Sequence, residues 1–68
     1  MKTAYDLLLD APDEQVTRCR LAWKAVAAGD WLDAAHFLRH AADEAGATLW
    51  AADARALADA FAAKSGAA

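Results

Sequence analysis

The fold of this chain is decided by residues 21–41, which read LAWKAVAAGDWLDAAHFLRHA. Gly29 and Asp30 interrupt two segments that are rich in alanine and in other helix-forming residues. Glycine is preferred just past the end of a helix, and aspartate is preferred just before the first turn of the next one. The stretch therefore predicts two antiparallel helices joined by a tight turn.

The rest of the chain predicts two further helices and no strand. Thr3 and Asp6 have the spacing of a capping box, which favours a short helix at the N-terminus. Pro12 suits the first turn of a second helix, and Thr48 is the expected cap of the last one. The tail, residues 65–68, is expected to fray. The predicted helices span residues 4–9, 12–28, 31–45 and 49–64.

The length and composition predict a single all-α domain over residues 1–68, a small bundle of three main helices plus a short N-terminal helix. About a third of the residues are alanine, which favours helix but buries little apolar area per residue. Such a thin core favours completion by self-association, so we expect a homodimer. The expected core comprises Tyr5, Leu7, Leu8, Leu9, Leu21, Trp23, Val26, Trp31, Phe37, Leu38, Leu49, Trp50, Leu57 and Phe61.

Charge and cysteine usage narrow the possible surroundings and partners. The net charge is −3 and the seven basic residues are scattered, which argues against a nucleic-acid surface. The single cysteine, Cys19, cannot form an internal disulfide, and it fits a reducing cytoplasm. We expect no signal peptide and no membrane span, because no apolar run approaches the ~20 residues that a span needs. The alanine content is compatible with a GC-rich bacterial or phage genome.

The predicted helix over residues 12–28 carries two apolar stripes on different sides, because residues two apart on a helix differ by roughly 200°. One stripe is expected to pack against the next helix, and it comprises Leu21, Ala22, Ala25 and Ala28. The other comprises Val16, Cys19, Trp23, Val26 and Ala27. A second stripe needs a second neighbour. That neighbour is another helix of this chain, a second copy, or a different protein.

The hairpin resembles one repeat of the tetratricopeptide (TPR) family over about half of the chain. Residues 21–22 correspond to the Leu-Gly pair of that repeat, residues 29–31 to its Gly-Asp-Tyr turn, and residues 34–41 to the small and apolar positions of its second helix. Arg18 and Ala25 stand where the family has tryptophan and tyrosine. The resemblance implies a protein-binding scaffold. It places Val16, Cys19 and Trp23 on the face that such repeats present to ligands.

Two other patterns carry alternative functions. His36 and His40 are spaced i, i+4 and are weak candidates for a surface metal site, although no metal site is assigned. The residues from Ala42 through Gly46 to Thr48 resemble the turn of a helix-turn-helix motif, which predicts a small DNA-binding transcription regulator. The following helix has few basic residues, and this argues against DNA binding.

We predict a non-enzymatic protein-interaction module, a small adaptor or a stoichiometric inhibitor of a larger protein, with no cofactor. The chain offers no nucleophile elbow and no glycine-rich phosphate loop. The alternatives are the DNA-binding regulator and a purely structural dimeric helical protein with a surface metal site. The predicted partner-binding residues are Val16, Cys19, Arg20, Trp23, Lys24 and Val26.

Overall fold

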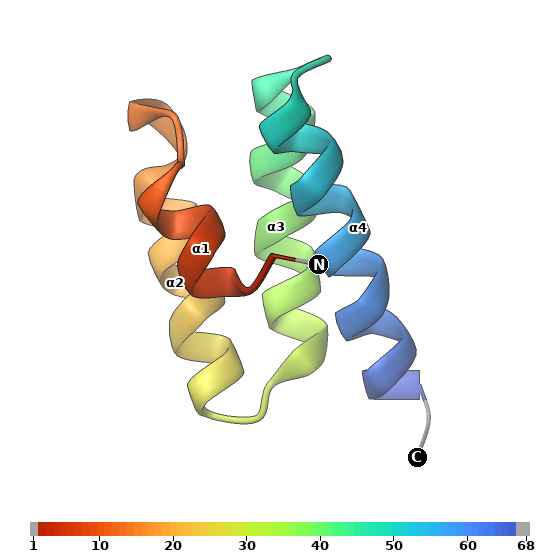
Figure 1. Cartoon of the computed structure of the whole chain (residues 1–68). Helices are drawn as coiled ribbons and strands as arrows, with labels where there is room; N and C mark the ends of the chain where they lie inside the picture. The colour runs from red at the N-terminus through yellow and green to blue at the C-terminus, as the bar shows by residue number, and fades with distance from the viewer. Residues whose placement is uncertain (1, 67–68) are drawn as a thin grey trace.

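The computed structural model of the chain describes residues 2–66, and these residues form helices and turns without a strand (Figure 1). The prediction of an all-α fold is confirmed. The elements are α1 (Ala4–Leu9), a 3-10 turn η1 (Asp13–Gln15), α2 (Val16–Ala27), α3 (Trp31–Ala45) and α4 (Leu49–Gly66).

The helix ends follow the capping rules that the sequence indicates. The Asp6 backbone N–H donates to the Thr3 hydroxyl at 3.2 Å, and the Thr3 N–H donates to the Asp6 carboxylate at 3.0 Å, which completes the capping box. The Ala51 N–H donates to the Thr48 hydroxyl at 3.0 Å at the start of α4. Gly29 ends α2 with φ +76°, a left-handed conformation that other residues adopt only with strain. Asp30 precedes α3 without a capping hydrogen bond from its side chain.

Two helix boundaries differ from the prediction. The helix expected over residues 12–28 is divided, because the backbone of Pro12 is extended and the next three residues form a 3-10 turn before α2 begins at Val16. Within that turn the Gln15 side chain is buried, and it makes hydrogen bonds with residues of α2 and α3. At the other end, α4 continues through Gly66. Of the expected frayed tail, residues 67–68 lie outside the described part of the chain.

The helix α3 is the centre of the arrangement. It packs against α2 on one side and α4 on the other, and successive helices run antiparallel (Figure 1). The short α1 lies over α2 and also reaches α4, where the Trp50 indole N–H donates to the Leu7 carbonyl at 3.0 Å. The antiparallel hairpin predicted over residues 21–41 is present as α2 and α3.

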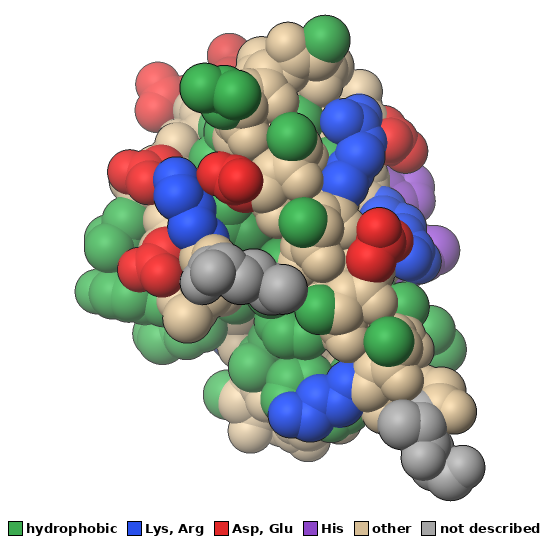
Figure 2. Space-filling view, turned by 45° about the vertical axis from the view of Figure 1, so that its right-hand side comes forward, with side chains coloured by type: hydrophobic (Ala, Val, Ile, Leu, Met, Phe, Trp, Pro, Cys, Tyr) green, Lys and Arg blue, Asp and Glu red, His purple; other side chains and the backbone are tan. Residues whose placement is uncertain are grey.

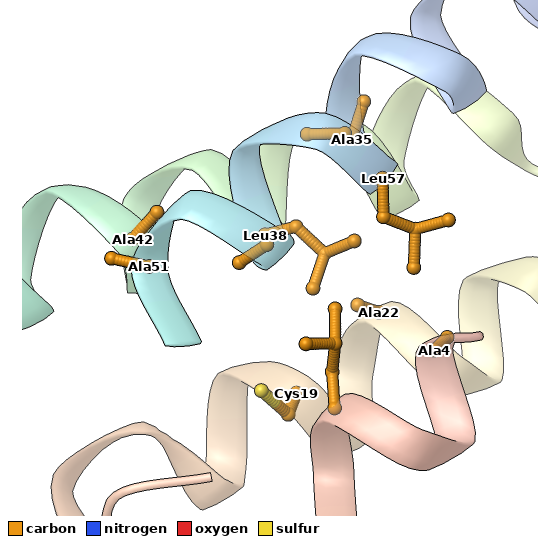
Figure 3. Packing of buried hydrophobic residues seen from close by; sticks show 11 residues of the cluster. Ala4, Cys19, Ala22, Ala35, Leu38, Ala42, Ala51 and Leu57 are labelled. Carbon is orange, nitrogen blue, oxygen red and sulfur yellow. The ribbon is translucent and has the colours of Figure 1, made fainter. Parts of the chain in front are cut away.

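The buried core consists mainly of alanine. Leu38 of α3, Leu57 of α4 and Cys19 of α2 point into the space between the helices (Figure 3). Around them the structure buries alanines that let the helix backbones approach closely. The core cluster comprises Ala4, Leu7, Cys19, Ala22, Ala35, Leu38, Ala42, Ala51, Ala54, Leu57 and Ala58.

The predicted list of core residues is wrong for five of its members. Tyr5, Leu9, Leu21, Trp23 and Leu49 are all exposed. Leu21 was expected to face α3, but of its predicted stripe Ala22 is buried and Leu21 is exposed. The buried side of α2 carries Cys19 and Ala22, with Val26 packed at its edge. This side lies between the two predicted stripes, and α2 contacts both α1 and α3.

Candidate protein-binding surface on α1 and α2

An aromatic pair joins α1 to α2 at the surface of the molecule. The rings of Tyr5 and Trp23 have centroids 5.6 Å apart and are tilted by 49°. This distance lies within the range of favourable aromatic contacts. Both side chains keep a large exposed fraction, 48% for Tyr5 and 43% for Trp23. The pair therefore fixes α1 on α2 and still presents aromatic surface to the outside.

Leu9 extends this apolar surface along α1. It follows Tyr5 by four residues, so the two side chains share one face of the helix, and Leu9 is 65% exposed. We call the surface formed by Tyr5, Leu9 and Trp23 the α1–α2 patch. Leu7 and Ala4 point the other way and are buried in the core. With only six residues, α1 cannot bury both of its apolar sides.

The six residues predicted to bind a partner divide into three groups. Trp23 lies in the α1–α2 patch, and Arg20 and Lys24 are exposed on the same helix. Val16 and Val26 are half-buried, and Val26 packs against the core cluster. Cys19 is buried with 1% exposure, so it supports the surface from below and offers no contact area. The sequence missed Tyr5 and Leu9 as surface residues, although their i, i+4 spacing was visible.

Burial also determines the chemistry of Cys19. Loss of solvation disfavours the thiolate and raises the pKa of the Cys19 thiol to about 11. A thiol with this pKa is neutral at physiological pH and is a poor nucleophile and metal ligand. Cys19 is a small buried hydrophobic residue, which agrees with its place on an apolar stripe of the predicted helix.

Basic residues of α2 differ in how they are used. Arg18 forms an ion pair with Glu44 of α3 and donates to the Gln15 side chain at 3.1 Å. Gln15 in turn donates to Glu44 at 3.3 Å, so the network ties the start of α2 to the end of α3. Within residues 2–66, Arg20 and Lys24 take part in no ion pair. These two cations remain available beside the α1–α2 patch.

Elsewhere, Lys2, Arg39 and Arg55 form ion pairs with acidic side chains. Lys2 lies 3.5 Å from Asp10 and 3.4 Å from Asp53, and its hydrogen bond with Asp53 raises the pKa of the Lys2 ammonium. Arg39 of α3 lies 2.9 Å from Asp59 of α4. Figure 2 shows basic side chains lying beside acidic ones over much of one face.

The surface of α4 bears on the DNA-binding alternative. Arg55, the early cation of this helix, donates to the Ala42 carbonyl at 3.1 Å and lies 3.6 Å from Asp43. The exposed start of α4 presents Leu49 and Ala52. A recognition helix needs free polar and basic side chains for bases and phosphates. The Arg55 guanidinium instead contacts the Ala42 carbonyl and Asp43 of α3.

His36 and His40 lie together on the exposed side of α3, with ring centroids 5.0 Å apart. In the part of the chain that the structure describes, no group of three or more His, Cys, Asp or Glu side chains is arranged to hold a metal ion. Among the described residues, His36 and His40 are therefore two candidate ligands without a third.

Comparison of the chain with protein-family models, with curated proteins and with solved structures gave no match. The TPR resemblance of the α2–α3 hairpin stays a prediction. Among residues 2–66, no helix has the length and apolar character needed to cross a membrane.

Proposed function

We propose that this protein is a non-enzymatic interaction module, an adaptor or a stoichiometric inhibitor that binds a larger protein through the α1–α2 patch. The observation that carries the proposal is the Tyr5–Trp23 pair, which is held in place by mutual contact and remains half-exposed. Tryptophan and tyrosine are enriched among the residues that dominate binding energy at interfaces. A pre-positioned aromatic pair also loses little conformational entropy when a partner binds.

The cations beside the patch favour a partner with acidic residues around its contact surface. Arg20 and Lys24 are exposed and have no ion-pair partner among the described residues. Charges at the rim of an interface accelerate association and select among partners more than they add affinity. Arg20 and Lys24 would therefore act on the association rate, while Trp23 would govern dissociation.

The proposal includes a homodimer and a cytoplasmic location. The single buried thiol of Cys19 supports a reducing compartment. Self-association would cover the exposed apolar side chains of the α1–α2 patch, and a foreign partner would cover the same residues. The two events would thus compete. The TPR resemblance supports a binding role for α2, but α1 packs on part of the face that it assigns to ligands, and of Val16, Cys19 and Trp23 only Trp23 is well exposed.

Affinity capture from the native host tests the proposal with wild-type protein and with Trp23→Glu, Leu9→Glu and Leu32→Glu variants. Leu32 is a matched control, because it is 61% exposed on α3 and lies outside the patch. We expect wild type and Leu32→Glu to recover the same partner, and the two patch variants to lose it. Circular dichroism establishes that each variant is folded. Equal recovery by folded patch variants would overturn the assignment of the surface.

Size-exclusion chromatography with light scattering tests the homodimer using the same variants. We expect wild type and Leu32→Glu to elute as dimers and Leu9→Glu as a monomer. Leu9 is the more informative position, because it is more exposed than Trp23 and has less contact to lose within its own chain. A wild-type protein that is monomeric at high micromolar concentration would contradict the homodimer. It would not contradict binding to a different protein.

A further inference from the structure

The outward face of α3 carries two imidazoles at close range. His36 and His40 are both exposed, their ring centroids are 5.0 Å apart, and the rings are tilted by 51°. Within residues 2–66, no side-chain hydrogen bond or ion pair engages either ring. The histidine side chains reach the surface at the right-hand edge of Figure 2. Their ring nitrogens are therefore available to an external ligand.

The spacing of the two rings matches that of two imidazoles on one metal ion. A ring nitrogen lies about 2.0–2.1 Å from a bound Zn²⁺, which puts the ion about 3.2 Å from the centre of the ring. Two such rings at tetrahedral angles have centres about 5.2 Å apart, and at right angles about 4.5 Å apart. The observed 5.0 Å lies between these values. The separation of the two rings is thus compatible with chelation of one ion by both.

The charges near the pair favour a cation. Asp33 precedes His36 by three residues, so its carboxylate lies on the same side of α3 as the pair, whereas Glu44, four residues after His40, is already paired with Arg18. The nearby cation Arg39 lies between the two histidines in sequence, but its guanidinium is held 2.9 Å from Asp59 on α4. A divalent ion at the pair would thus lie near the carboxylate of Asp33 and near an arginine that is already paired.

We propose that His36 and His40 chelate one divalent transition-metal ion of the borderline class, Zn²⁺, Ni²⁺ or Cu²⁺. Neutral imidazole suits these ions, and the Irving–Williams order places Cu²⁺ and Ni²⁺ among those bound most strongly by a nitrogen site. The described residues bring no third metal-ligating side chain into the group, so the chain supplies two ligands. The remaining positions are filled by water or by the same pair of a second copy. The site is separate from the α1–α2 patch and does not depend on the proposed function.

Isothermal titration calorimetry with Ni²⁺ and with Zn²⁺ tests the site on the full, untagged chain. The variants are His36→Gln, His40→Gln, and a double substitution, His40→Gln with Asp43→His. The double variant keeps two histidines on α3 but spaces them seven residues apart, about 10.5 Å along the helix, which is too far for one ion. It therefore separates chelation from the mere presence of two imidazoles.

We expect the wild type to bind one ion per chain, or one ion per two chains if a second copy completes the coordination. Each single variant should bind on the order of 100-fold more weakly, because the second ligand of a chelate acts at a high effective concentration. The double variant should be as weak as the single ones. The proposal would be overturned if either glutamine variant bound the ion as tightly as the wild type, or if the double variant did. It would also be overturned if the wild type bound no ion. Circular dichroism identifies any variant that fails to fold.

Discussion

The α3–α4 contact and the α1–α2 contact differ in how completely they bury their side chains. Between α3 and α4 the buried residues are mostly alanine, and Ala35, Ala42 and Ala54 have no exposed surface. Charges on the flanks of that contact are paired across it, as in Arg39 with Asp59. Between α1 and α2 the large side chains Tyr5 and Trp23 meet, and both stay half-exposed.

The difference follows from the length of the helices and the size of the side chains. The 15 residues of α3 and the 18 of α4 run beside each other, and small side chains let their backbones approach closely along that length. The six residues of α1 provide less than two turns. A helix so short cannot cover the aromatic side chain of a longer neighbour. The α3–α4 contact therefore buries its small residues completely, whereas the α1–α2 contact leaves Tyr5 and Trp23 half-exposed.

The largest effect on stability is expected from Leu38→Ala, which tests how completely the core beside α3 is buried. Leu38 is one of the largest side chains with no exposed surface, so its truncation leaves a cavity in a small core. We expect the free energy of unfolding to fall by about 2–5 kcal/mol, measured by urea denaturation. The matched control is Leu32→Ala on the same helix, which should change stability by no more than about 0.5 kcal/mol because Leu32 is exposed. Equal effects of the two substitutions would mean that Leu38 is not buried as described.

Ala42→Leu tests whether the α3–α4 contact depends on small residues. Ala42 and Ala51 belong to the buried cluster shown in Figure 3, and neither has exposed surface. A larger side chain there forces the helices apart, and we expect a loss of about 1–3 kcal/mol in urea denaturation. Ala52→Leu on the exposed side of α4 is the control and should be nearly neutral. A stable Ala42→Leu protein would show that α3 and α4 leave space between them.

Thr3→Ala tests the weaker side of the comparison by removing the cap of α1. The substitution eliminates the hydrogen bond from the Asp6 N–H to the Thr3 hydroxyl. We expect a loss of about 1 kcal/mol, together with a change in tryptophan fluorescence because Trp23 and Trp50 both contact α1. Thr3→Ser retains the hydroxyl oxygen and should behave like the wild type. If the fluorescence is unchanged when the cap is lost, α1 is held by packing alone.

Glu44→Gln should have the smallest effect, and it tests the polar tie between α2 and α3. The hydrogen bond from Arg18, followed by that from Gln15, lowers the pKa of Glu44 below its ordinary value of 4.5. The ionised form therefore stabilises the folded state above about pH 4.5, and this contribution is lost as the pH falls through the lowered pKa. We expect the melting temperature of wild type to fall more steeply than that of Glu44→Gln between pH 6 and pH 3. Parallel curves would contradict the role of this carboxylate.

Local sequence signals predicted the helices well. The bounds of α1 and α3 agree with the expected ranges, since Thr3 with Asp6 and Gly29 with Asp30 act within one or two turns of the chain. The 3-10 turn before α2 was not predicted. Gln15 bonds to Glu44, which lies 29 residues away, and no local pattern reports such a contact.

The candidate surface was only partly predictable. The sequence identified Trp23, Arg20 and Lys24 as surface candidates but grouped them with Cys19, which is buried. It placed Tyr5 and Leu9 in the core, because apolar periodicity shows which side chains share a helix face and does not show how far a neighbouring helix covers that face. For the same reason Leu21 was assigned to the contact with α3 and is instead 40% exposed.

The sequence by itself determined the helices, their caps and the tight turn at Gly29, because these depend on interactions between residues close in the chain. Only the tertiary structure decided which side of α2 faces inward, the exposure of Leu21 and the exposure of the Tyr5–Trp23 pair. Those features depend on where α1 lies on α2 and on how closely α3 approaches α4. Such placements are set by contacts between residues far apart in sequence, and a stripe of apolar residues is compatible with more than one of them.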